Sequence, residues 1–495
     1  MVSGPVAQEK QGTWIISVIG ATLKKLRDDA NDAALSPDGS QIVFHDATTQ
    51  ELWVMNADGR QAHLLIKSEA GYHLFKPTWF PDGQRIAYGR FHSANGQTTI
   101  ALESSDLKGS DPEVLYSNPR LQDFCWAQAG RLIFTQGNQP PNQYDSNLWE
   151  LRFDPHTGKP KDAPRQLTDW TGFSFDNLAM TSDNKRLVFL NDHVQSDVYV
   201  GELANGELRP PERLTLDDRL DWPAGWSQDS KTILFYSNLA GNLDVYKQNV
   251  AGGGAQPVVT GEEEKREPQF SPDGKWILYL AWPKAPDNAV IASGKLMREP
   301  VNGGPPEPVM DIAGHPGSAT SNFAADTVNG FPSFRCRAIC VLAEKVEDKK
   351  LAFTQFDPQS GRKGSPLSMD ADPDLTSWNL SPDGKQLVLS KFDFKSAEVQ
   401  IMPLAVGSTQ KLSALPWTQL VSVAWAADGG SLLLTAFSSR GASVISLGLS
   451  GPPRLLRKTT WDIYSIFPSP DGRSLALGPL ITNANAWTIA DFPEK

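Results

Sequence analysis

A Ser-Pro-Asp-Gly turn that recurs along the chain is the sequence feature that most constrains the fold. Clear copies begin at Ser36, Ser271, Ser381 and Ser469, and a Pro-Asp-Gly copy follows Phe80. In each copy, proline presets φ for the first corner, aspartate bonds its own backbone and glycine accepts positive φ. An apolar residue precedes each turn and a short apolar run follows it, so each copy predicts a β-hairpin.

The spacing between the turns sets the size of the repeating unit. Weaker copies follow Trp126, Met180, Trp226 and Trp425, and a degraded copy lies near Phe334. Consecutive copies are about 45 residues apart, which is the length of a four-stranded propeller blade. A second strand with alternating apolar and polar residues follows each turn, as in 51–56, and a return strand often comes next.

We therefore predict an all-β protein, a β-propeller of four-stranded blades with about ten repeats. The repeats would form either one large ring or two packed propeller units. We expect a tail over residues 1–11, a first set of repeats over 12–330 and a second set over 331–495, which is either separate from the first or continuous with it. The Pro/Gly-rich stretch 283–317 is the best linker candidate, and residues 13–27 could supply outer strands to the last blade.

Composition and motifs exclude several classes of function. The net charge of −11 argues against a nucleic-acid partner, which would need a basic surface. No apolar run reaches membrane-spanning length, and no signal peptide is evident. We expect no cofactor and no metal, because the sequence has no glycine-rich phosphate loop and no His/Cys pairs at ligand spacing. The acidic clusters at 217–221 and 370–374 match no calcium motif and are interpreted as solvated loops.

The turns and the strand Leu52–Gly59 resemble TolB-type propeller repeats. Stretches such as Trp14–Val18 and Ser146–Glu150 are similar to the C-terminal sensor propellers of bacterial serine/threonine kinase or winged-helix signalling proteins. This resemblance implies a non-catalytic binding or sensor module, the extracytoplasmic part of a bacterial signalling protein, located in the periplasm. Its partner would be a protein, a peptide or a small polar ligand.

Two alternatives remain open. The first is a free-standing TolB-like envelope scaffold for protein–protein interaction. The second is a propeller hydrolase, because such blades also occur in front of α/β-hydrolase peptidases. Those enzymes need a Gly-x-Ser-x-Gly nucleophile elbow, which this sequence lacks. We therefore expect no enzymatic activity and no catalytic residue.

Candidate ligand-binding residues follow from the propeller geometry. The segment that leads into each innermost strand lies at one rim of the central channel, and here those segments come just before the turns. Aromatic and charged residues that converge on such a rim suit the binding of a peptide or a small polar ligand. The candidates are Tyr72, His73, Arg120, Asp123, Trp170, Asp176, Arg219, Asp221, Trp222, Lys265, Glu267, Asp374, Trp461, Asp462 and Tyr464.

The chain has three cysteines: Cys125, Cys336 and Cys340. Cys336 and Cys340 lie close enough in the sequence to bridge across a bent hairpin, which would leave Cys125 free. Three reduced thiols are the alternative, because spacing alone does not establish disulfide geometry.

Overall fold

The computed structural model describes most of the chain, and every regular element in it is a β-strand. The described residues are 2–4, 12–16, 23–46, 48–69, 71–94, 97–127, 130–138, 145–154, 159–170, 172–181, 183–217, 219–283, 293–313, 332–347, 349–372, 376–391, 398–405, 407–412, 417–438 and 441–490. Within these ranges no helix is long and apolar enough to cross a membrane.

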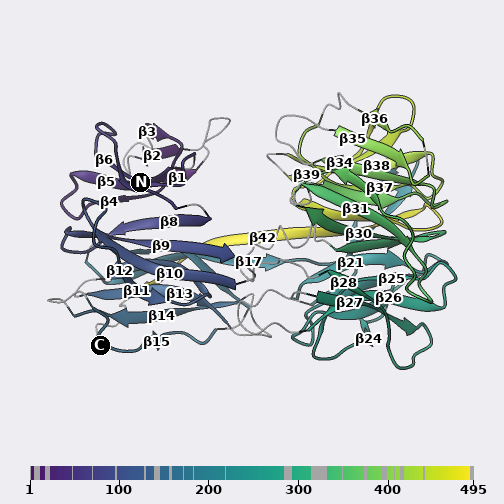
Figure 1. The fold of residues 1–495 in the computed structure, drawn as a ribbon, viewed down its shortest axis with the longest axis horizontal. Helices are drawn as coiled ribbons and strands as arrows, with labels where there is room; N and C mark the ends of the chain where they lie inside the picture. Colours follow the sequence, from purple (N-terminus) through teal and green to yellow (C-terminus); the bar gives the residue numbers. More distant parts are fainter. Residues whose placement is uncertain are drawn as a thin grey trace. The chain divides into compact units, whose positions relative to one another are not determined.

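The strands form two compact units, whose sheets are seen in Figure 1. Unit 1 comprises residues 1–193, 286–289 and 483–495, and unit 2 comprises 194–285 and 290–482. The predicted all-β propeller of four-stranded blades is confirmed, because most sheets are antiparallel and have four strands. The expected boundary at 330–331 lies outside the described residues, whereas the units divide between His193 and Val194.

Unit 2 is built from six blades in the part of the chain that is described. In five of them the four strands follow one another in the sequence. The first two blades are β21 (Asp221–Trp226), β22 (Thr232–Ser237), β23 (Asp244–Asn249) and β24 (Gln256–Val259), and then β25 (Glu264–Phe270), β26 (Trp276–Trp282), β27 (Ser293–Pro300) and β28 (Glu307–Ala313). The next three are β29 (Ser333–Cys336), β30 (Cys340–Glu347), β31 (Lys350–Phe356) and β32 (Leu367–Asp370); β33 (Thr376–Leu380), β34 (Gln386–Lys391), β35 (Glu398–Pro403) and β36 (Gln410–Leu412); and β37 (Leu420–Trp425), β38 (Ser431–Ser438), β39 (Gly441–Gly448) and β40 (Arg454–Lys458).

The sixth blade joins two distant parts of the chain. It combines β41 (Asp462–Pro468) and the start of β42 (Ser474–Ala490) with β18 (Tyr199–Ala204) and β20 (Glu212–Arg213); β19 (Glu207–Leu208) also pairs with β18. Tyr199 pairs with Leu477 across this junction. Each inner strand contacts the next, and β41 contacts β21, so the six blades close a ring and one large ring of all repeats is excluded.

Two local expectations about unit 2 are therefore wrong. The last blade is completed by residues 199–213 rather than 13–27, because β42 finds its partner strand in β18. The linker candidate 283–317 contains β27 and β28, two strands of one blade. Residues 301–306, which include two glycines and two prolines, make the turn between those strands, and Gly303 takes a φ of 86°.

Unit 1 is built from five successive sheets of described strands. They are β1 (Val2–Gly4), β2 (Gly12–Ile16) and β3 (Leu23–Asp28); β4 (Ala30–Leu35), β5 (Gln41–Asp46), β6 (Leu52–Asn56) and β7 (His63–Ile66); β8 (Tyr72–Trp79), β9 (Arg85–Ala94), β10 (Gln97–Asp106) and β11 (Glu113–Ser117); β12 (Leu121–Ala127), β13 (Arg131–Gly137), β14 (Ser146–Arg152) and β15 (Arg165–Gln166); β16 (Ser174–Met180) and β17 (Arg186–Gln195) beside β42. The expected tail thus contains a strand, β1, which pairs with β2.

The Ser-Pro-Asp-Gly turns close the hairpins between the first and second strands of the blades. In the first copy, the Ser36 hydroxyl donates to Asp38 (2.6 Å) and accepts from the Gln41 N–H (2.9 Å). The hydrogen bond from Ser36 is the main cause that lowers the pKa of Asp38 to about 2. Degraded copies keep the turn. Asn184 and Ser230 occupy the position that is glycine in the clear copies, and they take φ values of 57° and 59°.

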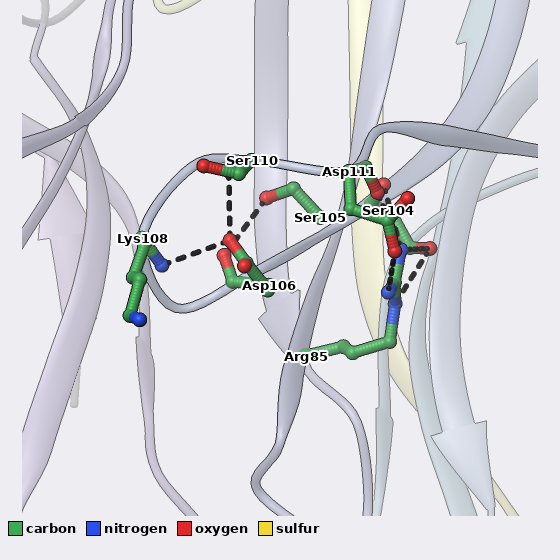
Figure 2. Close-up of polar contacts among 7 residues, drawn as sticks. All are labelled: Arg85, Ser104, Ser105, Asp106, Lys108, Ser110 and Asp111. Atoms are coloured by element: carbon green, nitrogen blue, oxygen red, sulfur yellow. Dashed lines mark hydrogen bonds and ion pairs between the residues drawn. The ribbon is translucent and has the colours of Figure 1, made fainter.

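A second turn, rich in aspartate, joins the outer strands of a blade. Figure 2 shows it between β10 and β11, where Asp106 accepts hydrogen bonds from the backbone N–H groups of Lys108 (3.0 Å) and Ser110 (2.7 Å). Arg85, on β9, reaches the same end of the blade and pairs with Asp111 at 3.2 Å. These contacts hold the outer edge of the blade to its second strand.

The hairpin between β29 and β30 lacks the Ser-Pro-Asp-Gly turn and carries a disulfide instead. Cys336 and Cys340 are opposite one another in the register of the two strands and form the disulfide, while Cys125 is free and buried. The covalent bond thus holds the hairpin where the other blades use turn hydrogen bonds.

Replacing both bridged cysteines by serine should lower the stability of unit 2. For so short a closed loop, the chain-entropy relation gives a loss of about 2 kcal/mol. The midpoint of urea unfolding measures it, and reductant should shift the wild type but not the C336S/C340S variant. A wild-type protein that is insensitive to reductant would contradict this expectation.

Candidate functional site

The inner strands of unit 2 surround a channel, which is the candidate functional site. Its lining comes from the inner strands β21, β25, β29, β33, β37 and β41, with one residue, Tyr236, from β22. β-bulges interrupt β21, β25, β37 and β41. A bulge re-aims a side chain, and here Glu267 and Tyr464 stand at bulges and line the channel.

The channel wall is polar and aromatic. Its residues are Trp222, Pro223, Ala224, Tyr236, Glu267, Gln269, Ser333, Arg335, Thr376, Ser377, Trp378, Asn379, Ser422, Val423, Tyr464, Ser465, Ile466 and Phe467. Such a wall can stack on apolar side chains of a ligand and can also hydrogen-bond to a peptide backbone.

Hydrogen bonds between neighbouring blades fix the inner strands. The Gln269 side chain donates to the Phe334 carbonyl (2.8 Å) and accepts from the Cys336 N–H (2.9 Å). The Trp378 indole donates to the Ser333 hydroxyl at 2.8 Å. Where the ring closes, the Trp226 indole donates to the Phe467 carbonyl at 2.9 Å. These bonds join strands of different blades, so the wall of the channel is preorganised.

An ion pair lies on the channel wall between two blades. Arg335 Nη1 donates to Glu267 Oε2 at 2.9 Å, and the two side chains are 17% and 23% exposed. Burial raises the pKa of Glu267, and the charge of Arg335 opposes that rise. Glu267 also takes a φ of 51°, which is uncommon for a residue with a side chain. The Arg335 guanidinium further lies over the Trp378 ring, 5.5 Å from its centroid.

Five of the sequence-predicted residues of unit 2 either line the channel or are buried. Trp222, Glu267 and Tyr464 line the channel. Asp221 is fully buried, and Lys265 is buried in an ion pair with Asp244 at 2.9 Å.

Three other predicted residues of unit 2, Arg219, Trp461 and Asp462, are not among the described residues that line the channel. Trp461 packs against Tyr199, with ring centroids 5.2 Å apart. Arg219 is exposed, and the half-buried Asp462 has a pKa raised by burial. Asp374 lies outside the described residues.

The predicted residues of unit 1 have mainly structural contacts. Tyr72 stacks on His92, and Trp170 packs in an aromatic cluster with Phe175. The exposed His73 packs near Phe91, with ring centroids 6.0 Å apart.

The charged candidates of unit 1 lie in a turn, on the surface and in a buried ion pair. Arg120 is in the turn before β12, and Asp176 is exposed and accepts from the Asn177 N–H. Asp123 is buried and ion-paired with Lys76, and it also accepts from the Leu178 N–H at 2.8 Å. Asp123 thus ties strands of three blades together.

Sequence reasoning missed several residues of the channel wall, among them Gln269, Arg335 and Trp378. They lie inside the inner strands rather than before them. Alternation along each inner strand could have found Arg335, which shares a face with Ser333. The degraded turn near Cys336 concealed where that strand begins. Among the described residues, no group of three or more His, Cys, Asp or Glu side chains is placed to hold a metal ion.

Comparison with curated proteins finds relatives that are named dipeptidyl-peptidase 5. The chain is 26% identical over 298 residues to dipeptidyl-peptidase 5 of Porphyromonas endodontalis, covering 56% of this chain and 39% of that protein. It is 22% identical over 298 residues to dipeptidyl-peptidase 5 of Porphyromonas gingivalis, covering 56% and 40%. The chain thus spans about two fifths of the length of the relatives it matches. No protein-family profile matches the sequence.

The solved structures that match this chain include tricorn protease and a putative TolB. Tricorn protease is 11% identical, with a TM-score of 0.28, and the match covers 94% of this chain and 50% of that one. A putative TolB from Agrobacterium tumefaciens is 13% identical, with a TM-score of 0.24, covering 59% and 86%.

The relatives correct the expected function. We expected a non-catalytic sensor module and no enzymatic activity, but two curated relatives of this chain are named as dipeptidyl-peptidases. The absence of a Gly-x-Ser-x-Gly motif led to this wrong expectation. The motif indicates whether this sequence carries a serine nucleophile, but not whether the chain is related to part of a peptidase.

Proposed function

We propose that this chain is the propeller of a peptidase and that the channel of unit 2 receives the peptide. The observation that carries the proposal is the match of more than half of the chain to two dipeptidyl-peptidases. The proposal assigns no residue the role of nucleophile, because the sequence contains no Gly-x-Ser-x-Gly motif.

The channel offers what an extended peptide needs. Peptide backbones need hydrogen-bond donors and acceptors, which Thr376, Ser377 and Asn379 supply along one strand. Apolar side chains need aromatic surface, which Trp222 and Tyr464 supply from two other strands. The disulfide supports an extracytoplasmic location, because disulfides persist in oxidising compartments.

Binding of a fluorescein-labelled hexapeptide, followed by anisotropy, tests the proposal. We expect a dissociation constant in the range of about 1 μM to 1 mM, and Tyr464→Ala should weaken binding about tenfold by removing aromatic contact. Tyr116→Ala is the matched control, because Tyr116 lies on β11, the outermost strand of a blade in unit 1.

Mass spectrometry of the same mixtures detects cleavage, which would support the proposal directly. Absence of both binding and cleavage, or binding that Tyr464→Ala and Tyr116→Ala weaken equally, would overturn it.

A further inference from the structure

One residue from each blade of unit 2 lines the channel at the same position of its inner strand. This position lies three residues before the last residue of the strand, and four of its six residues are serines. The six are Pro223, Glu267, Ser333, Ser377, Ser422 and Ser465. A serine hydroxyl donates and accepts hydrogen bonds without carrying a charge. This level of the channel is therefore polar, and Glu267 is the one residue of the six that can be charged.

The carboxylate at this level is compensated within the wall. Glu267 accepts from Arg335 at 2.9 Å, and these two are the only charged side chains among the described residues that line the channel. A charged side chain of a ligand would lose its water there and would find no opposite charge that is not already paired. Such a transfer costs free energy, whichever sign the charge has. The wall therefore disfavours both acidic and basic side chains.

Asn379 carries a hydrogen-bond acceptor that the protein leaves open. It is 4% exposed and lines the channel, and its Oδ1 has no hydrogen-bond partner in the described part of the chain. Gln269 occupies the equivalent position, one residue before the end of its inner strand, and its side chain bonds the backbone of the next blade at two points. Asparagine is one methylene shorter than glutamine, which accounts for the missing contact.

A second polar atom of the same wall is also open. Ser465 Oγ, on β41, is buried without a hydrogen-bond partner among the described residues. A buried polar group that lacks a hydrogen bond costs free energy, and a ligand that supplies the bond removes that cost. An amide group is neutral and carries both an N–H donor and a carbonyl acceptor. Amide groups therefore suit the open atoms of Asn379 and Ser465 without bringing a charge into the channel.

We propose that the channel of unit 2 selects peptide segments with uncharged side chains, and that Asn379 accepts a hydrogen bond from an amide N–H of the bound peptide. This inference rests on the proposed function and names the substrate class of the same channel. The amide N–H belongs either to the peptide backbone or to an asparagine or glutamine side chain, and both sources offer the same chemistry.

Isothermal titration calorimetry with four unlabelled hexapeptides tests the selectivity. The peptides are acetylated and amidated, share one sequence and carry glutamine, leucine, glutamate or lysine at one internal position. We expect the glutamate and lysine peptides to bind at least about tenfold more weakly than the glutamine peptide. Equal binding of the leucine and glutamine peptides would assign the N–H donor to the backbone, and weaker binding of the leucine peptide would assign it to the side chain.

The same titrations separate failure of this inference from failure of the proposed function. A charged peptide that binds as tightly as the glutamine peptide would overturn the selectivity and leave the proposed function standing. Binding of none of the four peptides would count against the proposed function itself, and this inference would fall with it. The comparison is made on the wild-type protein, so it needs no variant to fold.

Asn379→Leu tests the role of the open acceptor. It should weaken binding of the glutamine peptide about fivefold without lowering the melting temperature, because leucine removes an acceptor that has no partner in the described chain. A purely structural role would lower the melting temperature instead. Asn249→Leu is the matched control, because it makes the same change at the exposed end of β23, and it should keep the wild-type affinity. Unchanged binding by Asn379→Leu, or an equal loss in both variants, would overturn the assignment of Asn379.

Discussion

Lys76→Met should destabilise the protein by about 3–5 kcal/mol at pH 8, because it leaves the Asp123 carboxylate buried without its cation. Asp123 is 1% exposed, and its ion pair with Lys76 joins β12 to β8. Methionine keeps most of the length of the lysine stem, so the change tests the charge rather than the packing. The midpoint of urea unfolding measures the loss.

The same variant should be much less destabilised at pH 5. Burial already raises the pKa of Asp123 to about 6 in the presence of Lys76, so the carboxyl group is protonated at pH 5 and needs no cation. Lys185→Met, which removes an exposed lysine of unit 1, should change stability by less than about 0.5 kcal/mol. A loss from Lys76→Met as small as that of the control would show that the pair contributes little.

Asp221→Asn should stabilise unit 2 at pH 8, by on the order of 2–4 kcal/mol, and have almost no effect at pH 4. Burial is the main cause that raises the pKa of Asp221 to about 7, and the charges of Asp217 and Asp197 add to it. A carboxyl group whose folded pKa lies above its unfolded value holds its proton more tightly in the folded state. Its contribution is therefore fully present near pH 4 and is lost as the pH rises through 7.

Thermal unfolding of wild type and Asp221→Asn from pH 4 to pH 8 measures this difference. Asp38→Asn is a control of opposite sign, because hydrogen bonds from Ser36 and Ser40 lower the pKa of Asp38 to about 2. Asp38→Asn should lose stability above pH 4 and approach the wild type as the pH falls toward 2. A difference between Asp221→Asn and wild type that does not grow with pH would refute the assignment.

The repeated turns predicted the blades because each turn is a local structure. Ser36, Asp38 and Gly39 form their contacts within a few residues, so the sequence alone specifies the hairpin. No local sequence pattern of this kind indicates how the ring of unit 2 closes. β18 pairs with β42, and nothing in the segment around Tyr199 indicates a partner that lies more than two hundred residues away.

The candidate site could be predicted only in part. Trp222, Glu267 and Tyr464 reach the channel wall, although their role in binding stays a prediction. Trp170 was singled out for its aromatic ring, which packs against Phe173 and Phe175 instead. An aromatic residue near a turn serves a blade core as well as a ligand, and sequence alone does not distinguish the two environments.

The β18–β42 pairing has a consequence for how unit 2 reaches its native state. Bringing together strands so far apart in the chain costs on the order of 5 kcal/mol of loop-closure entropy. The five contiguous blades can form before that step, and until it occurs they leave strand edges unpaired at both ends of an incomplete ring. An incomplete ring can accept β42 from a second molecule as readily as its own, which is the route to domain-swapped dimers. Refolding at low protein concentration therefore favours the monomeric ring.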